Sequence, residues 1–334
     1  MDIDDVLSQV NKKFGSGSLV KLSDTPPEIP RLPSGNIELD MILNGGYPKG
    51  CIGELFGMES GGKSTLAMMA AAQSQKEGKL VGYIDAENSL SREMAEACGL
   101  DVESMILGQP PHGEAGLEMA EELLRVPEIG IIVVDSVAAL TPQAVIRGDF
   151  DDAHIGVQAR MMSQGLQKIN STMLSLKTDT IVLFVNQLRE KIGSVGFGPS
   201  TTTPGGRALK FYSSVRLDVR RTGQIKGKEG EPPVGQTVQI SVAKNKSAPP
   251  FRKVNLELRY QGGISNAASI LNLCLSKSLI VQKGAWFADA ETGQSLAQGR
   301  TAMIDLLSQQ QELFDTYLKG VLSEEQGQKG DSAT

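Results

Sequence analysis

One segment, residues 57–64, constrains the fold more than any other part of the chain. It reads GMESGGKS and matches the pattern G-x-x-x-x-G-K-[ST] at every fixed position. An apolar run at 52–56 precedes it and predicts a strand, and an Ala- and Met-rich stretch at 64–76 follows it and predicts a helix. A Gly-rich loop between a strand and a helix N-terminus gathers backbone N–H groups that bind phosphate. The segment therefore predicts nucleoside triphosphate binding, with an ordinary Gly-rich turn as the alternative.

The residue types in this loop suit the parts of a bound triphosphate. The Lys63 ammonium is placed for the β- and γ-phosphates, and the Ser64 hydroxyl is placed for Mg²⁺. The predicted ATP-binding residues of the loop are Gly57, Glu59, Ser60, Gly61, Gly62, Lys63, Ser64 and Thr65.

Composition narrows the class of protein. The chain has 334 residues, 40% of them hydrophobic, which supports a sizeable core, and no apolar stretch approaches the ~20 residues of a membrane span. The N-terminus is acidic, unlike a signal peptide, and three cysteines without C-x-x-C spacing argue against a zinc site and fit a reducing cytosol. Because the formal net charge is −6, any DNA site must be a local group of basic residues and backbone N–H groups.

Strands and helices alternate through the middle of the chain. Short apolar runs at 80–84, 131–134 and 180–185 predict strands, and helical patterns at 114–126 and 158–176 separate them. Continuous apolar strands with helices between them are typical of a parallel sheet covered on both faces. We therefore expect an α/β fold. The runs at 215–219, 237–242 and 254–260 follow one another without helices and predict antiparallel strands at the sheet edge.

The flanking regions have different character. Residues 4–14 predict an amphipathic helix, 19–22 a strand, and the Pro-rich stretch 23–33 a linker. The N-terminal segment at 1–33 is too small to fold alone and is expected to pack on the core or, as an oligomerisation segment, on a neighbouring subunit. The other predicted domains are an ATPase core at 34–262, a small domain at 263–322 with a turn or hairpin around Trp286, and a polar, disordered tail at 323–334.

Polar residues at predicted strand ends supply further parts of a triphosphatase. Asp135 follows an apolar strand and suits Mg²⁺ or its water, although a strand-terminal Asp can also cap the next turn. Glu87 is the first candidate for the base that orients the attacking water; Asp85 either takes that role or orients the loop. Gln187, at the end of the strand at 180–185, suits a sensor of the γ-phosphate.

Two irregular stretches are candidates for binding other molecules. Residues 189–207 are rich in Gly, Pro and Ser/Thr, have basic ends and show no apolar period. Such a loop suits a nucleic-acid backbone, with a plain surface loop as the alternative. The stretch at 143–154 has no charge pattern that indicates DNA binding.

Together these segments resemble the bacterial RecA recombinases. The resemblance lies in GMESGGKST at 57–65, DAE at 85–87, VVDSVAALTP at 133–142, ARMMSQ at 159–164 and TTTPGGRALKF at 201–211. It continues in NQ at 186–187, VRLDVRR at 215–221, KNK at 244–246 and GAW at 284–286, and runs from about residue 10 to residue 286. It implies a RecA-like P-loop core with a mostly parallel central sheet, an N-terminal helix-strand docking segment and a small C-terminal α+β domain.

The resemblance also implies roles for named residues. Glu87 is then the catalytic carboxylate, and Gln187 couples the γ-phosphate to the long loop. Lys244 and Lys246 reach the ATP of the adjacent subunit, as an arginine finger does. The residues implied to contact DNA are Arg160, Ser163, Arg189, Gly205, Gly206, Arg207 and Ile155, the last in a second loop at 148–156. Phe211 and Lys210 are implied to lie at a subunit interface that builds a helical filament.

Several residues depart from the family pattern. Asn88 replaces a His, and Ser91 and Met94 replace an Asp and a Tyr around adenine, so that Met94 is expected to pack on the base. Gln167, Gln239 and Ser241 replace basic residues, and 288–297 lacks lysines that are common there. Fewer phosphate contacts predict weaker capture of duplex DNA. The chain is expected to be a divergent member of the family, either a phage-encoded protein or a paralogue.

The sequence thus predicts a DNA-dependent ATPase that forms filaments on single-stranded DNA, pairs it with homologous duplex and exchanges strands. The expected ligands are ATP and Mg²⁺. The expected partners are DNA and further copies of the chain in the cytoplasm, with a LexA-like repressor and single-strand-binding or loader proteins as further candidates. Two alternatives stay open: a ring-forming helicase or motor on the same core, and a regulatory paralogue that exchanges nothing.

Overall fold

A computed structural model of the chain describes residues 2–24, 28–149, 156–190, 201–227 and 230–331. The chain divides into two compact units, Met1–Pro30 and Arg31–Thr334, which are described in turn. None of the helices in the described ranges is long and apolar enough to cross a membrane.

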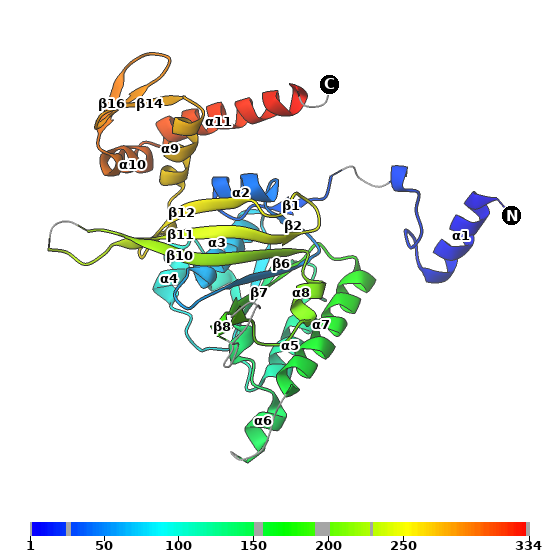
Figure 1. Ribbon diagram of the computed structural model, residues 1–334. Coiled ribbons are helices and arrows are strands. Elements are labelled where there is room, and N and C mark those ends of the chain that lie inside the picture. Colours follow the sequence, from blue (N-terminus) through cyan, green and yellow to red (C-terminus); the bar gives the residue numbers. More distant parts are fainter. Residues whose placement is uncertain (1, 25–27, 150–155, 191–200, 228–229, 332–334) are drawn as a thin grey trace, which may run out of the picture. The chain divides into compact units, whose positions relative to one another are not determined.

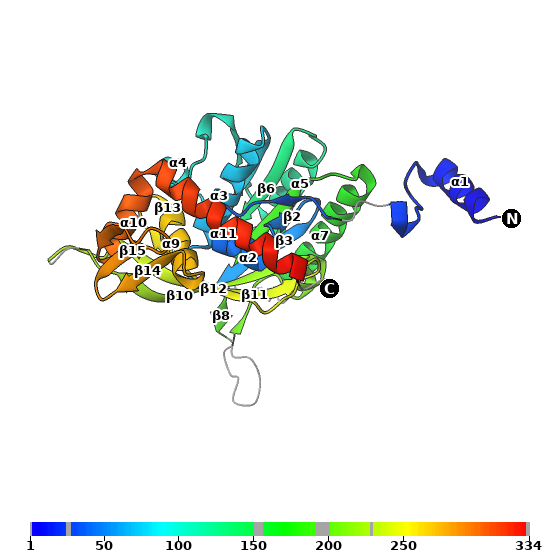
Figure 2. The same cartoon turned by 90° about the horizontal axis from the view of Figure 1, so that it is seen from above.

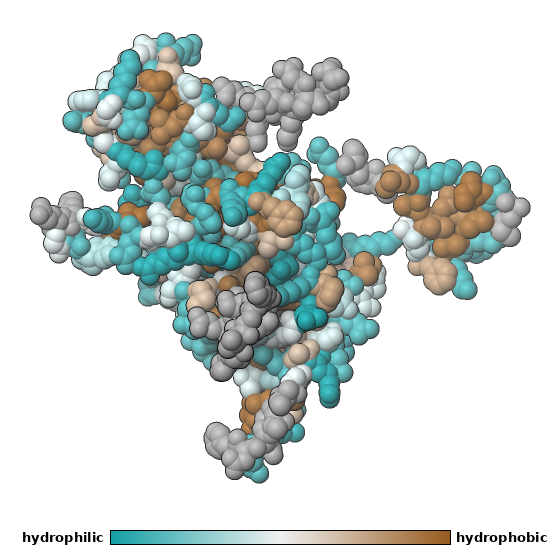
Figure 3. Space-filling view, viewed as in Figure 1, coloured by the Kyte–Doolittle hydropathy of each residue, from teal (hydrophilic) through white to brown (hydrophobic). Residues whose placement is uncertain are grey.

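The N-terminal unit is built around helix α1 (Ile3–Phe14). Asp2 and Asp5 form a capping box that satisfies backbone N–H groups at its first turn. No residue of α1 is buried, and Ile3 and Phe14 are 57% and 66% exposed. Figure 3 shows apolar side chains gathered on this unit. An amphipathic helix with an uncovered apolar face is typical of a segment that packs on another surface.

The strand expected at residues 19–22 does not form. Leu19 instead exchanges two hydrogen bonds with the Asn11 side chain, at 2.9 and 3.0 Å, and Leu22–Asp24 forms a 3₁₀ turn, η1. An isolated extended segment has no ladder to join, so its backbone takes the nearest local partners.

A large sheet forms the centre of the second unit (Figures 1 and 2). In the described residues its nine strands follow the order β13-β12-β11-β10-β3-β7-β6-β4-β5. The strands are β3 (Ile52–Gly57), β4 (Leu80–Asp85), β5 (Met105–Gly108), β6 (Ile129–Asp135), β7 (Ile181–Gln187), β10 (Val215–Ile225), β11 (Gly235–Asn245), β12 (Lys253–Arg259) and β13 (Gly263–Ile264).

The pairing pattern confirms the predicted fold class. Strands β3 to β7 and the first half of β10 pair in parallel, whereas β10, β11, β12 and β13 pair antiparallel at one edge. The central parallel strands are almost entirely apolar and buried, as expected for a sheet covered on both faces. The carboxyl ends of the parallel strands therefore meet at one edge, where ligands bind in such folds.

Helices cover both faces of the sheet. The covering helices are α2 (Ile37–Leu43), α3 (Lys63–Lys76), α4 (Arg92–Ala97), α5 (Gly113–Leu123), α7 (Val157–Leu176) and α8 (Ala208–Tyr212). The short helix α6 (Gln143–Arg147) has no buried residue and belongs to neither core cluster. One core cluster joins α2, α3 and α4 to one face, and a second joins α5, α7 and α8 to the other. Shorter elements are β1 (Arg31–Leu32) paired with β2 (Tyr47–Pro48), β8 (Arg189–Glu190) paired with β9 (Thr201–Thr202), η2 (Val102–Ser104) and η3 (Val137–Ala139).

The last part of the chain forms its own hydrophobic cluster. It comprises α9 (Asn266–Ser276), β14 (Ile280–Lys283), β15 (Trp286–Asp289), β16 (Ser295–Gln298), α10 (Arg300–Gln309) and α11 (Gln311–Asp331). The hairpin predicted around Trp286 is present as β14 and β15. Helix α11 continues past Ser323, where the sequence predicts a disordered tail, and reaches Asp331.

Candidate functional site

The phosphate loop lies at the carboxyl end of β3. A Cβ on Gly57 would lie 2.0 Å from the carbonyl oxygen of Val219, so only glycine lets the loop pass beside β10. Gly62 caps α3 with φ of 92°, a conformation that favours glycine. The helix begins at Lys63, so its free N–H groups point into the loop. The predicted strand, loop and helix are thus all present in the expected order.

Lys63 is buried at the base of this loop. Its Nζ donates to the carbonyl oxygen of Met58 at 2.7 Å. Burial lowers the pKa of the Lys63 ammonium, and the nearby carboxylates of Asp135, Glu87 and Glu59 oppose that change. A desolvated ammonium among carboxylates interacts strongly with an anion that enters the loop.

Asp135 lies at the end of β6, beside the first turn of α3. Its carboxyl accepts a hydrogen bond from the Tyr83 hydroxyl at 2.9 Å. Burial raises its pKa, as do the neighbouring Glu87 and Asp85 carboxylates, while the nearby Ser64 and Tyr83 hydroxyls lower it. The fold therefore brings together Ser64 and Asp135, which are far apart in the sequence.

Glu87, Ser136 and Gln187 meet beside the loop although they come from three different segments. Ser136 Oγ donates a short hydrogen bond to Glu87 Oε1, and Gln187 Nε2 donates to the same oxygen at 3.1 Å. Asp85, the alternative base, accepts from the backbone N–H groups of Ser89 and Leu90 at 3.3 and 3.0 Å. Asp85 thus holds the turn that follows Glu87.

A pocket of about 230 Å³ opens beside the phosphate loop. Besides loop residues, it is lined by Met94 of α4 and by three residues that the sequence analysis missed: Gln236, Leu258 and Tyr260. These three lie on or just beyond the antiparallel edge strands, more than 170 residues after the loop, and no local pattern marks them. Gln236 Nε2 donates to the carbonyl oxygen of Ser60 at 2.8 Å, and this hydrogen bond joins β11, which lines the pocket, to the phosphate loop.

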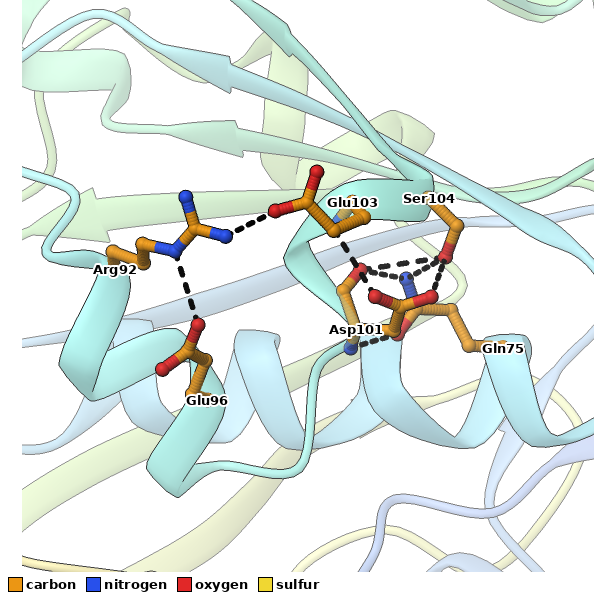
Figure 4. A network of polar contacts seen from close by, with 6 residues as sticks. All are labelled: Gln75, Arg92, Glu96, Asp101, Glu103 and Ser104. Carbon is orange, nitrogen blue, oxygen red and sulfur yellow. Dashed lines mark hydrogen bonds and ion pairs between the residues drawn. The ribbon is translucent and has the colours of Figure 1, made fainter.

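A surface network fixes α4, the helix that carries Met94 (Figure 4). Arg92 contacts Glu96 at 3.0 Å and also pairs with Glu103 of η2. Ser91 caps α4 by accepting from the backbone N–H of Met94 at 3.2 Å, and its hydroxyl donates to Glu93 at 2.6 Å. The Ser91 hydroxyl is therefore engaged in capping.

Lys244 and Lys246 lie at the opposite end of the strands from the phosphate loop. Lys244 Nζ donates to the carbonyl oxygens of Lys210 and Phe211, at 2.7 and 3.1 Å. Burial lowers the pKa of Lys244, and the neighbouring Lys246 and Arg216 lower it further. The Lys246 N–H donates to Ser214, which pairs with the first residue of β3, five residues or roughly 16 Å from the loop.

The residues predicted to contact DNA fall into two groups. Arg160 and Ser163 are exposed on α7, and Gly205 and Gly206 pack against the start of the same helix, where a Cβ on Gly206 would lie 2.8 Å from Ala159 Cβ. Gly205 is buried, whereas Arg207, which follows the two glycines, is exposed. The two glycines therefore bring the chain that carries Arg207 against α7, the helix that carries Arg160 and Ser163.

The remaining expected contact residues lie at the two ends of the long loop: Arg189 begins it and is expected to contact DNA, and Phe211 follows it and is expected at a subunit interface. Arg189 opens β8, opposite Thr202 of β9. Phe211, on α8, is 72% exposed, and Lys210 beside it is exposed. Ile155 and most of the loop at 148–156 lie outside the described residues, as does the middle of the loop at 189–207.

Comparisons with known proteins agree with this arrangement. A family model described as the RecA N-terminal domain matches residues 1–265. Protein RecA of Levilactobacillus brevis is 46% identical over 300 residues, which cover 89% of this chain and 78% of that protein. Protein RecA of Streptococcus pyogenes serotype M5 (strain Manfredo) is 45% identical over 317 residues, 94% of this chain and 82% of that protein. Protein RecA of Macrococcus caseolyticus is 46% identical over 315 residues, with coverage of 94% and 87%. This chain therefore belongs to the RecA family.

Proposed function

We propose that this RecA-family chain is a DNA-dependent ATPase that assembles on single-stranded DNA, pairs it with homologous duplex and exchanges strands. The observation that carries the proposal is the convergence of Lys63, Glu87 and Gln187 at the carboxyl edge of the sheet. That group combines a phosphate cradle, a base and a polar sensor, which are the parts that phosphoryl transfer to water needs.

Within this site, Glu87 polarises the attacking water. Its Oε1 already accepts from Ser136 and Gln187, and both donors hold the carboxylate in one orientation. Phosphoryl transfer depends mainly on positioning and charge, so an oriented carboxylate beside the loop is the appropriate group. The adenine base packs on Met94, Leu258 and Tyr260, which line the adjoining pocket.

The residues also fit Mg²⁺ bound with the triphosphate. The Ser64 hydroxyl and the Asp135 carboxyl are neighbours, and such hard oxygen donors suit this ion. The described residues hold no group of three His, Cys, Asp or Glu side chains that would form an all-protein metal cage, which agrees with an ion held largely by phosphates and water. When bound, Mg²⁺ neutralises charge that develops on the phosphates.

The DNA surface comprises Arg160, Ser163, Gly205, Gly206 and Arg207. Exposed arginines beside close-packed glycines suit a phosphate backbone that approaches the main chain. Arg189 and Ile155 belong to the two loops that complete this surface.

A second copy of the chain completes the nucleotide site. Lys246 binds at the level of the first residue of β3, about 16 Å along the sheet from its own phosphate loop. Lys244 is in register with Arg216 and Glu54, three residues or about 10 Å from that loop, and both separations favour action on the ATP of a neighbour. The exposed Phe211 and the exposed apolar residues of α1 suit contacts between subunits, and we propose that these contacts build a helical filament. A LexA-like repressor and single-strand-binding or loader proteins are further partners, and three cysteines without C-x-x-C spacing suit a reducing cytoplasm.

A strand-exchange assay tests this function. Circular single-stranded DNA, homologous linear duplex and ATP are incubated with the parent chain and with Lys63→Ala, and joint molecules are measured by gel electrophoresis. We expect joint molecules and DNA-stimulated ATP hydrolysis from the parent and neither from Lys63→Ala. ATP hydrolysis without joint molecules would instead support a motor, and electron microscopy would then distinguish rings from filaments. Binding of ATP with neither activity would support a regulatory paralogue.

A further inference from the structure

A carboxylate lies buried in the middle of the central sheet. Glu54 is 1% exposed and stands on β3, three residues before the phosphate loop begins at Gly57. A buried charge is tolerated only when it is paired and hydrogen-bonded. The partners of Glu54 therefore decide which parts of the molecule it holds together.

The two carboxylate oxygens of Glu54 hold two different strands. Oε2 accepts a short hydrogen bond from Arg216 Nε on β10, and the Arg216 guanidinium also lies 4.4 Å from the centre of the Phe56 ring. Oε1 accepts from Asn186 Nδ2 on β7 at 3.0 Å. Glu54, Asn186 and Arg216 are called the Glu54 triad below. The triad joins the strand that leads into the phosphate loop to both of its neighbours.

Asn186 extends these contacts to the nucleotide sensor and to the long loop. Its Oδ1 accepts from the backbone N–H of Gln187 at 2.9 Å, and Gln187 contacts Glu87. Its Nδ2 also lies 3.4 Å from the carbonyl oxygen of Pro204, where the chain returns from the 189–207 loop. One fully buried amide thus touches the sensor, the loop and the Glu54 carboxylate.

Arg216 extends the contacts in the opposite direction. It is paired in register with Lys244 of β11, whereas Leu217 is paired with Val242, so Ala243 is an extra residue in a β-bulge. Lys244 then reaches the carbonyl oxygens at the end of α8, the helix that follows the long loop. The Glu54 triad therefore lies between the sensor on one side and the strand that carries the interface lysine on the other.

We propose that Glu54 is a positioning residue that couples occupancy of the nucleotide site to the 189–207 loop. This role of Glu54 rests on the proposed function, since it assumes ATP at the phosphate loop and DNA at the long loop. The hydrogen bond to Glu54 fixes the position of Asn186 relative to β3. Through its own contacts, Asn186 then fixes Gln187 and Pro204. Because the interior is close-packed, a shift of Gln187 toward a bound γ-phosphate is transmitted to Pro204 through the same amide rather than absorbed locally.

The test compares Glu54→Gln, Asn186→Ala and a matched control, Glu257→Gln. The control removes the charge of another partly buried ion pair, Glu257 with Arg300 at 2.9 Å, far from the triad in the β12–α10 region. For each full-length variant, we measure the melting temperature, the Kd for a fluorescent ATP analogue, and the ATPase rate with and without single-stranded DNA. The readout is the ratio of the two rates.

We expect Glu54→Gln to keep the Kd within about twofold and the DNA-free rate near that of the parent. The DNA-stimulated rate should fall by about 10- to 100-fold, the cost typical of a displaced group. Asn186→Ala should lower the ratio similarly, and the double variant should lose little more, because both changes break the same connection. Glu257→Gln should leave the ratio unchanged.

Two results would overturn the proposal. If Glu54→Gln lowers both rates in parallel with melting temperature, Glu54 only stabilises the sheet. If the two single variants reduce the ratio independently, so that their effects multiply, they do not act through one connection. The ATPase rate of the parent with and without DNA is measured before any variant is compared. A parent chain without DNA-stimulated hydrolysis would contradict the proposed function rather than the role of Glu54.

Discussion

Gln187 Nε2 donates a hydrogen bond to Glu87 Oε1 at 3.1 Å, although 100 residues separate them. Gln187 is the last residue of β7 and Glu87 follows the end of the parallel strand β4, so the fold alone makes them neighbours. Since a γ-phosphate that enters the loop offers Gln187 a competing acceptor, occupancy of the site can release this contact. We propose that the pair supplies a route from the nucleotide to the loop that starts after Gln187.

Glu87→Gln should slow hydrolysis while nucleotide binding is kept. The amide preserves size and can still accept from Ser136 and Gln187, but it does not take a proton from water. A general base typically contributes about 10²–10⁴-fold, and we expect a loss of that size in the DNA-stimulated rate. Filaments should consequently persist, as measured by light scattering after ATP addition. Parent-level hydrolysis would transfer the base role to Asp85 or to a group from the neighbouring subunit.

Lys244→Ala and Lys246→Ala should each lose hydrolysis despite their distance from the phosphate loop of the same copy. A mixture of Lys63→Ala chains with Lys244→Ala/Lys246→Ala chains should recover part of the activity, because some interfaces then pair an intact loop with intact lysines. The ATPase rate is measured across mixing ratios, with fluorescence transfer between labelled chains as proof of mixed filaments. Zero recovery in mixed filaments would argue that the lysines act within their own copy.

Asp40→Asn should stabilise the chain at neutral and high pH. Burial raises the pKa of Asp40 from 3.8 to about 6 in the folded chain. Between those values the folded chain binds a proton more tightly than the unfolded chain, so the free energy of unfolding falls as pH rises. The asparagine can still accept the 2.6 Å hydrogen bond from the Ser34 N–H.

We expect the free energy of unfolding of Asp40→Asn to exceed that of the parent by about 1–3 kcal/mol at pH 8, and this difference should vanish near pH 4. Urea unfolding at several pH values measures it. Asp305→Asn, a change at an exposed aspartate of α10, is the control and should show no such trend. A constant difference between parent and Asp40→Asn at all pH values would mean that Asp40 is not the titrating group.

Gln239→Arg with Ser241→Lys should strengthen duplex capture by preformed filaments. Both residues lie on the same face of β11, where Gln239 pairs in register with Arg220 and Ser241 with Lys253 of β12. Each added phosphate contact should raise the log–log salt slope by about one unit. Duplex retention is measured against salt, and single-strand binding should stay nearly unchanged. Superimposable curves for parent and double variant would place the duplex site elsewhere, with Arg220, Arg221 and Arg300 as the next candidates.

Sequence alone was sufficient for the features that depend on neighbouring residues. The phosphate loop, its strand and its helix are contiguous, and the 3.6-residue apolar period of α7 matches the face it buries. The parallel sheet followed from alternating strands and helices. The strand expected at 19–22 was wrong because a strand needs a partner, and the Asn11 side chain provides a closer one.

Tertiary structure decided which distant residues share a site. Gln236, Leu258 and Tyr260 line the pocket beside the phosphate loop only because β12 pairs with β11 and β11 pairs with β10, next to β3. The Glu54 triad likewise joins three strands through the hydrogen bonds of one buried carboxylate. Local sequence patterns report period and propensity, whereas strand order and register are set by burial of the whole sheet. A residue that looks locally like one polar position in an apolar strand can therefore connect the strands that carry the site.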